Sequence, residues 1–106
     1  MERTLKALAA PVRRRILHLV WCEERTAGDI ADRFEVTFGA VSQHLKVLRE
    51  AGLVAVRQEG RRRWYRARQD TLGPLAQALE AEWSGHLTRL KTLAEEEVAH
   101  DHEERN

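Results

Sequence analysis

Apolar residues recur at helical spacing in four stretches before Gly52. A short helix is predicted around 4–9, and a second begins at Pro11, a residue favoured at the first position of a helix. Thr26 and Thr37 each precede a further apolar stretch, where a hydroxyl can accept a hydrogen bond from the first helical turn. The sequence therefore predicts four helices, of which the last two lie a few residues apart and the fourth ends at Gly52.

The spacing changes after Gly52, where residues 53–58 alternate between apolar and polar side chains. The pair Glu59-Gly60 signals a tight turn, and the alternation resumes over 61–67. This segment therefore predicts a two-stranded β-hairpin.

A long apolar stripe at helical spacing begins near Thr71 and continues through roughly 27 residues, or about 40 Å at 1.5 Å per residue. Such a helix outruns a domain of 106 residues, and its apolar face would be exposed unless a second copy covers it. We therefore expect a homodimer that pairs the last helix with its symmetry mate and with the first helix, through Leu5, Leu8, Leu72, Leu75, Leu79, Trp83, Leu87 and Leu90.

This order of elements predicts a mainly α fold with a β-hairpin wing, the winged helix-turn-helix, in which four helices precede the hairpin and one follows it. A single domain is expected over 1–99, and residues 100–106, which have no apolar content, are expected to form a flexible acidic tail. No stretch is apolar enough for a membrane helix and no secretory signal is apparent, so a cytoplasmic location is expected.

The formal net charge of +1 hides an asymmetry along the chain. Six arginines and one glutamate make residues 53–68 five charges positive, whereas six acidic residues and one arginine make residues 95–106 five charges negative. The hairpin could therefore meet phosphate, and the end of the chain would repel it.

A winged helix-turn-helix inserts its second motif helix into the major groove of DNA. With the apolar residues of the fourth predicted helix facing the core, its opposite face carries small and polar residues, and Gln43 can pair with adenine in the groove. Phe38 has two interpretations, contact with a thymine methyl group or packing at the helix start, and the sequence does not choose between them. The expected DNA contacts of this helix are Thr37, Phe38, Gly39, Ser42, Gln43, His44 and Lys46.

Three consecutive arginines follow the glycine of the predicted hairpin turn. Charged hairpins are often only solvated, but this cluster places guanidinium groups on both faces, where they could clamp phosphates or enter a narrow minor groove. The expected wing contacts are Arg57, Arg61, Arg62, Arg63 and Tyr65.

Three segments, KALAAPVRRRIL at 6–17, AVSQHLKVLREAGLV at 40–54 and EGRRRWY at 59–65, closely resemble the ArsR/SmtB-type bacterial transcriptional repressors. The resemblance runs from about residue 3 to residue 97, with the three segments in the family's order. It implies a homodimer with the first and last helices at the interface, an inverted-repeat operator, and repression that an effector relieves. It also implies DNA contacts at Phe38, Gly39, Ser42, Gln43 and His44.

The sequence departs from the metal-sensing members of that family. Those members carry a Cys-x-Cys motif on the helix that here reads TAGDI at 26–30, so no thiolate is available there. Other members use Asp and His on the last helix, and the spacing of His86 and His100 does not reproduce that set. His100 and His102 could hold zinc or nickel weakly, against the interpretation of a solvated tail. We expect no metal or other cofactor, and the sequence does not identify an effector.

We expect structural roles, rather than redox or metal-binding roles, for Cys22, His18 and His44. The single cysteine cannot form an intrachain disulfide, and we expect a buried, inert thiol on a helix rather than a redox switch. His18 and His44 are expected to pack or hydrogen-bond rather than to bind metal.

An enzyme is not predicted, because no nucleophile paired with a base, phosphate loop or metal-ligand set emerges from these residues. The stronger alternative is a winged helix that binds protein or RNA, since a fold does not fix a function. The polar helix face and the basic hairpin favour sequence-specific binding to double-stranded DNA by a repressor.

Overall fold

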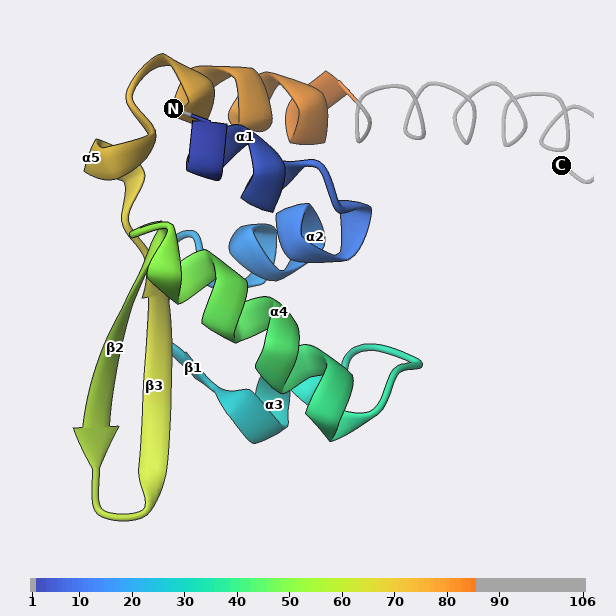
Figure 1. Ribbon diagram of the computed structural model, residues 1–106, viewed down its shortest axis with the longest axis vertical. Helices are drawn as coiled ribbons and strands as arrows, with labels where there is room; N and C mark the ends of the chain where they lie inside the picture. The colour runs from blue at the N-terminus through green and yellow to red at the C-terminus, as the bar shows by residue number, and fades with distance from the viewer. Residues whose placement is uncertain (1, 86–106) are drawn as a thin grey trace, which may run out of the picture. The chain divides into compact units, whose positions relative to one another are not determined.

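The computed structural model describes residues 2–85 of the chain (Figure 1). The chain divides into two compact units, residues 1–73 and a second unit that begins at Pro74, and each is described by itself. Within the described range, none of the helices has the length and apolar character that crossing a membrane requires.

Four helices form before Gly52, as the apolar spacing predicts. They are α1 (Glu2–Leu8), α2 (Pro11–Leu19), α3 (Ala27–Ala31) and α4 (Phe38–Glu50) (Figure 1). The Oγ1 atoms of Thr26 and Thr37 accept hydrogen bonds from the backbone N–H groups of Asp29 and Ala40, both at 3.1 Å, so both predicted N-caps are confirmed. Gly52 has a φ of +75°, which suits glycine at a helix end, and α4 stops just before it.

The sheet has three strands rather than the two that the sequence predicts. The hairpin joins β2 (Val54–Glu59) to β3 (Arg62–Ala67), and β1 (Arg25–Thr26) pairs with the other edge of β3, in the antiparallel order β1-β3-β2. The prediction missed β1 because a strand of two residues is too short to show alternation. This strand ties the start of α3 to the wing.

The core of the first unit lies where the helices cover the base of the sheet. Val41, Leu45 and Leu48 on α4 are no more than 1% exposed, and they pack in a core with Ile16 of α2 and Ile30 of α3, both fully buried. Burying an aliphatic side chain of this size contributes about 1.5–3 kcal/mol. This apolar stripe therefore fixes which face of α4 points outward.

The predicted continuous helix from Thr71 is wrong at Gly73. α5 (Gln69–Leu72) ends there, because Gly73 has φ +55° and ψ −130°, a conformation that helices do not contain and that favours glycine. A new helix starts at Pro74 and continues through residue 85. On it Leu79 is buried and Leu75 and Trp83 are half-buried. Leu87, Leu90 and the predicted tail at 100–106 lie outside the described residues.

Cys22 does not lie on a helix and is not buried, so the prediction of a buried helical thiol is wrong. α2 ends at Leu19, and Cys22 sits in an exposed bend before β1. The physical reason is pairing with β3, because the backbone N–H of Ala67 donates to the carbonyl of Val20 at 2.9 Å and turns the chain out of the helix.

Candidate nucleic-acid interface

The outward face of α4 is polar and accessible. Ser42, Gln43 and Lys46 are exposed, on the side opposite the buried stripe. Gly39 and the capping residue Thr37 are exposed at the N-terminal end of the same helix. The predicted division of α4 into a core face and a polar face is confirmed, and the exposed polar side chains suit hydrogen bonding to base edges.

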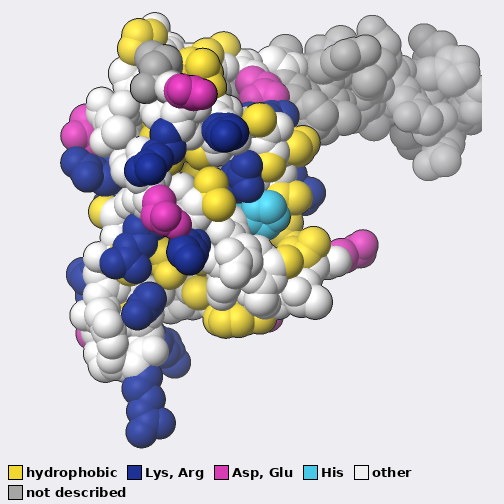
Figure 2. All heavy atoms as spheres, in the orientation of Figure 1, with side chains coloured by type: hydrophobic (Ala, Val, Ile, Leu, Met, Phe, Trp, Pro, Cys, Tyr) yellow, Lys and Arg dark blue, Asp and Glu magenta, His cyan; other side chains and the backbone are white. Residues whose placement is uncertain are grey.

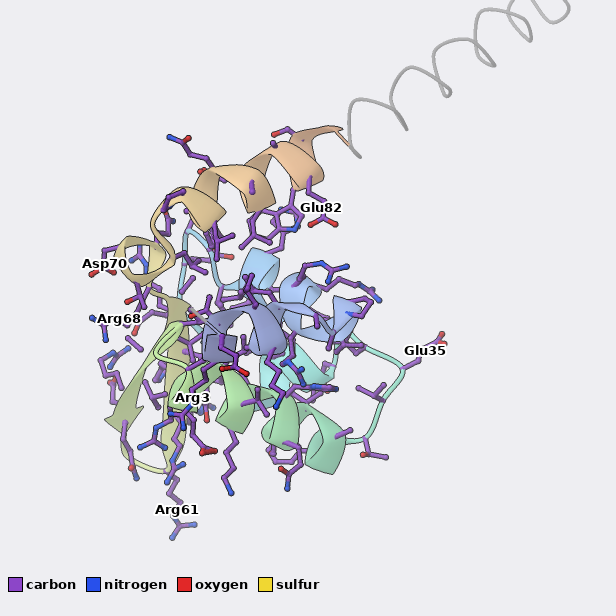
Figure 3. All side chains as sticks on the ribbon, turned by 45° about the horizontal axis from the view of Figure 1, so that its top comes forward. Arg3, Glu35, Arg61, Arg68, Asp70 and Glu82 are labelled. Carbon is purple, nitrogen blue, oxygen red and sulfur yellow. The ribbon has the colours of Figure 1, made fainter. Side chains whose placement is uncertain are left out.

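The tip of the hairpin carries arginines that make no ion pair within residues 2–85. Gly60 has a φ of +62° and forms the turn with Arg61, and Arg62 and Arg63 open β3. All three arginines are exposed. Figure 3 shows Arg61 projecting from the end of the hairpin, and Figure 2 shows Lys and Arg side chains gathered at this end and along the neighbouring face. The cluster is therefore available to an anionic partner.

An open groove of about 580 Å³ lies between the wing, the start of α3 and the start of α4. It brings together residues from three separate stretches of the sequence: Thr26, Ala27, Gly28, Phe38, Ser42, Arg61, Arg62, Arg63 and Tyr65. A second hollow of about 330 Å³ continues along α4, lined by Ser42, Gln43, Leu45, Lys46, Arg49, Arg63 and Tyr65. The polar helix face and the basic wing thus border one continuous surface.

Tyr65 lines both hollows although it is only 7% exposed. It lies on β3 between two neighbours, since it pairs with Arg25 of β1 and Val56 of β2. Most of its ring belongs to the core. Of the predicted wing residues, Tyr65 therefore forms the floor of the surface and the arginines at the tip form its rim.

Arg57 is held by acidic partners on both sides. Its Nε and Nη2 donate to the two carboxylate oxygens of Glu24, each at 3.0 Å, and Nη1 donates to Glu59 at 2.5 Å. The guanidinium carbon also lies 5.5 Å from the centre of the Trp64 ring. The hydrogen bond from Arg57 lowers the pKa of Glu24, and the same contact raises the pKa of Arg57. Arg57 thereby fastens β2 to the segment before β1.

Arg25 supports the position of α3 and was missed by sequence reasoning. It donates to the carbonyl of Leu19 at 3.0 Å and to the carboxylate of Asp29 at 2.9 Å, and it also pairs with Glu23. The hydrogen bond from Arg25 lowers the pKa of Asp29. One side chain on β1 therefore connects the end of α2 with the first turn of α3. The opposite charges of Arg25 and Asp29, four residues apart, were the one local signal for this contact.

His44 lies on a different face of α4 from Ser42 and Gln43. It is half-buried, and its Nδ1 lies 3.2 Å from Nη1 of Arg13 on α2. Burial lowers the pKa of His44, and the Arg13 cation lowers it further. The expectation that His44 hydrogen-bonds inside the protein is confirmed.

No group of three or more His, Cys, Asp or Glu side chains in the described part of the chain is arranged to hold a metal ion. His86, His100 and His102, the histidines considered for zinc or nickel, lie outside that part.

A family model described as bacterial regulatory protein, arsR family, matches residues 10–56, which span α2 to the start of β2. The chain is 36% identical over 96 residues to the HTH-type transcriptional regulator Rv2034 of Mycobacterium tuberculosis, and the alignment covers 91% of this chain and 90% of that protein. It is 35% identical over 65 residues to the transcriptional repressor SdpR of Bacillus subtilis, covering 61% of this chain and 72% of that protein.

A solved structure agrees with these relatives. The homodimeric winged helix-turn-helix DNA-binding domain Mb0332 from Mycobacterium bovis, described as a possible ArsR-family transcriptional regulator, is 33% identical with a TM-score of 0.69. The match covers 81% of this chain and 80% of that chain. The predicted winged helix-turn-helix fold is therefore confirmed.

Proposed function

The chain belongs to the arsR family of bacterial regulatory proteins, and we propose that it is a transcriptional repressor that binds a double-stranded DNA operator as a homodimer. Its relatives include a protein named as a transcriptional repressor, and a neighbouring structure is named as a homodimeric DNA-binding domain. Regulation of this kind takes place in the bacterial cytoplasm, and it involves no catalytic step.

One observation carries the proposal: a polar helix face and a cluster of arginines without ion pairs in residues 2–85 border the same groove. In this proposal α4 enters the major groove, where Ser42 and Gln43 hydrogen-bond to base edges and Lys46 reaches a guanine or a phosphate. Arg62 and Arg63 contact the sugar-phosphate backbone or the adjacent minor groove.

In the proposed homodimer, the helix that begins at Pro74 pairs with its symmetry mate and with α1. Leu5, on α1, is 52% exposed although it is a large hydrophobic residue, which supports an interface on that helix. A two-fold dimer presents two copies of α4, and the operator would then be an inverted repeat whose half-sites lie about one helical turn apart.

The test is selection of binding sites from a random duplex DNA pool by the full chain, followed by affinity measurements over a range of salt concentrations. The proposal expects an inverted repeat, bound by two protomers, with an affinity that falls steeply as salt rises because phosphate contacts release counterions. Selection of no shared sequence, or tighter binding to RNA than to any selected duplex, would contradict it and favour a winged helix that binds RNA or protein.

A further inference from the structure

Phe38 is the most exposed large hydrophobic side chain in the part of the chain that the structure describes, at 56%. It is the first residue of α4, and the packing around the helix start leaves more than half of the residue accessible. Burying the ring in the core would stabilise the folded chain, but the fold leaves the residue exposed and gains no such stability from it. Packing at the helix start, one of the two interpretations that the sequence left open, therefore does not account for this residue.

The ring borders the groove described above. Phe38 and Ser42 lie four residues apart on α4 and so share one face of the helix, and both line the groove. The remaining lining is mostly small or basic, with Tyr65 as its floor. Phe38 therefore places one accessible apolar surface next to hydrogen-bonding groups.

Gly39 leaves the backbone beside the ring bare. A Cβ atom added at Gly39 would meet only the Oγ1 atom of Thr37, at 3.9 Å, which is an ordinary contact. The φ of Gly39 is not positive, so neither space nor conformation requires glycine in the fold, and alanine is the better helix former. The missing side chain gives access to a partner from outside.

The major groove of DNA presents one prominent apolar group, the C5 methyl group of thymine. We propose that Phe38, which lies one turn of α4 before Ser42, packs against the methyl group of one thymine in each half-site. Phe38 thereby determines part of the operator sequence, next to the base edges that Ser42 and Gln43 contact. This inference rests on the proposed function. An aromatic ring can also stack on an unpaired base. Duplex DNA is favoured because the polar groups that flank Phe38 on α4 suit base edges in a groove.

The experiment uses the full chain and a duplex selected by the unmodified protein from a random pool. Each thymine of one half-site is replaced in turn by deoxyuridine, which lacks only the methyl group. We expect one position at which the replacement weakens binding about fourfold, the effect of removing one buried methyl group. The variant Phe38→Ala should bind the selected duplex more weakly and should not distinguish thymine from deoxyuridine at that position.

Val36→Ala is the matched control, because Val36 is also an exposed hydrophobic residue, at 39%, but does not line the groove. This variant should keep the discrimination between thymine and deoxyuridine, and Phe38→Leu should keep part of it. Thermal unfolding of Phe38→Ala should match that of the unmodified protein, since the ring is exposed.

Discrimination that persists in Phe38→Ala, or indifference of the unmodified protein to every replacement, would overturn the inference while leaving sequence-specific duplex binding intact. Tighter binding to a single strand that depends on Phe38 would also overturn it, in favour of stacking on unpaired bases. The proposed function fails separately, when the unmodified protein selects no sequence at all.

Discussion

The guanidinium group of Arg13 connects α4 to α1 through His44. Its Nη1 lies 3.2 Å from Nδ1 of His44, while Nε and Nη2 donate to the carbonyls of Ala7 and Lys6 at 2.6 and 3.1 Å. Arginine stays protonated in proteins and can only donate, so Nδ1 of His44 accepts and the imidazole is neutral with its proton on Nε2. A protonated His44 would lose this hydrogen bond and face a cation.

We predict that His44 makes the stability of the protein depend on pH. Its folded-state pKa is lowered by burial and by Arg13, so the unfolded chain binds the proton more readily. This stability is present above the unfolded pKa of about 6.5 and is lost as the pH falls through the folded pKa. Urea unfolding at about pH 7.5 and at about pH 5.5 measures this change in the free energy of unfolding. Both pH values lie above the usual pKa values of carboxylates, so carboxylates contribute little to the difference.

His44→Gln is the informative variant, because a glutamine side chain can still accept from Arg13 but does not titrate. The loss of stability between the two pH values should be smaller in this variant than in the unmodified protein. Equal losses in the two proteins would show that His44 does not contribute.

The wing arginines should differ in what they contribute to DNA affinity. Arg62→Ala and Arg63→Ala should weaken binding to all duplexes to a similar extent, and each should reduce the slope of log affinity against log salt by about one if it contacts a phosphate. Arg57→Ala is the comparison, because Glu24 and Glu59 already pair with the guanidinium group of Arg57. The Arg57→Ala substitution should therefore change the salt slope less. A larger effect of Arg57→Ala would mean that DNA displaces those carboxylates.

The dimer can be tested on α1 without disturbing the core. Leu5→Glu replaces a side chain that is 52% exposed, so the protomer should stay folded while a charge opposes the apolar interface. Sedimentation should then show a folded monomer at micromolar concentrations, where the unmodified protein and the control Val36→Glu are dimers. A dimer of Leu5→Glu with unchanged affinity would place the interface elsewhere. Leu79→Glu, at a buried position, should give monomers or insoluble protein.

Soft metals should not release the protein from DNA. Residues 26–30 contain no thiolate, and each protomer has one cysteine, so no multi-thiolate site can form within a protomer. Operator binding should be unaffected by micromolar cadmium or arsenite, and release by either would contradict the prediction. Zinc and nickel are tested on the full chain and on a form that ends at Ala99, which lacks His100 and His102. Release that disappears on truncation would identify a sensor in that segment.

Sequence patterns predicted the elements whose signals are local. The apolar spacing on α4 and the two threonine caps needed only neighbouring residues, and the structure confirms them. Two features depend on partners far along the chain, so no local pattern predicted them. These are strand β1, which pairs with β3, and the ion pair of Arg57 with Glu24, which lie 33 residues apart. The pair Gly73-Pro74 was a local signal for a break, and the continuous apolar stripe concealed it.

Which side chains of α4 are exposed was predictable from the local apolar spacing. Which residues of other elements lie beside them was not predictable. The buried stripe decides that Ser42 and Gln43 point outward, but only the folded chain shows that Phe38 and the hairpin arginines border one groove. The place of His44 against Arg13 likewise depends on how α2 packs on α4.

The placement of α4 in the major groove is tested most directly by the base preference of Gln43→Ala. Affinities are compared for the selected operator and for every single base-pair substitution of one half-site. We predict that this variant loses about 1–3 kcal/mol on the selected operator and no longer discriminates among substitutions at one position, while Arg62→Ala keeps the full preference. An unchanged base preference in Gln43→Ala would contradict the placement of α4 in the major groove.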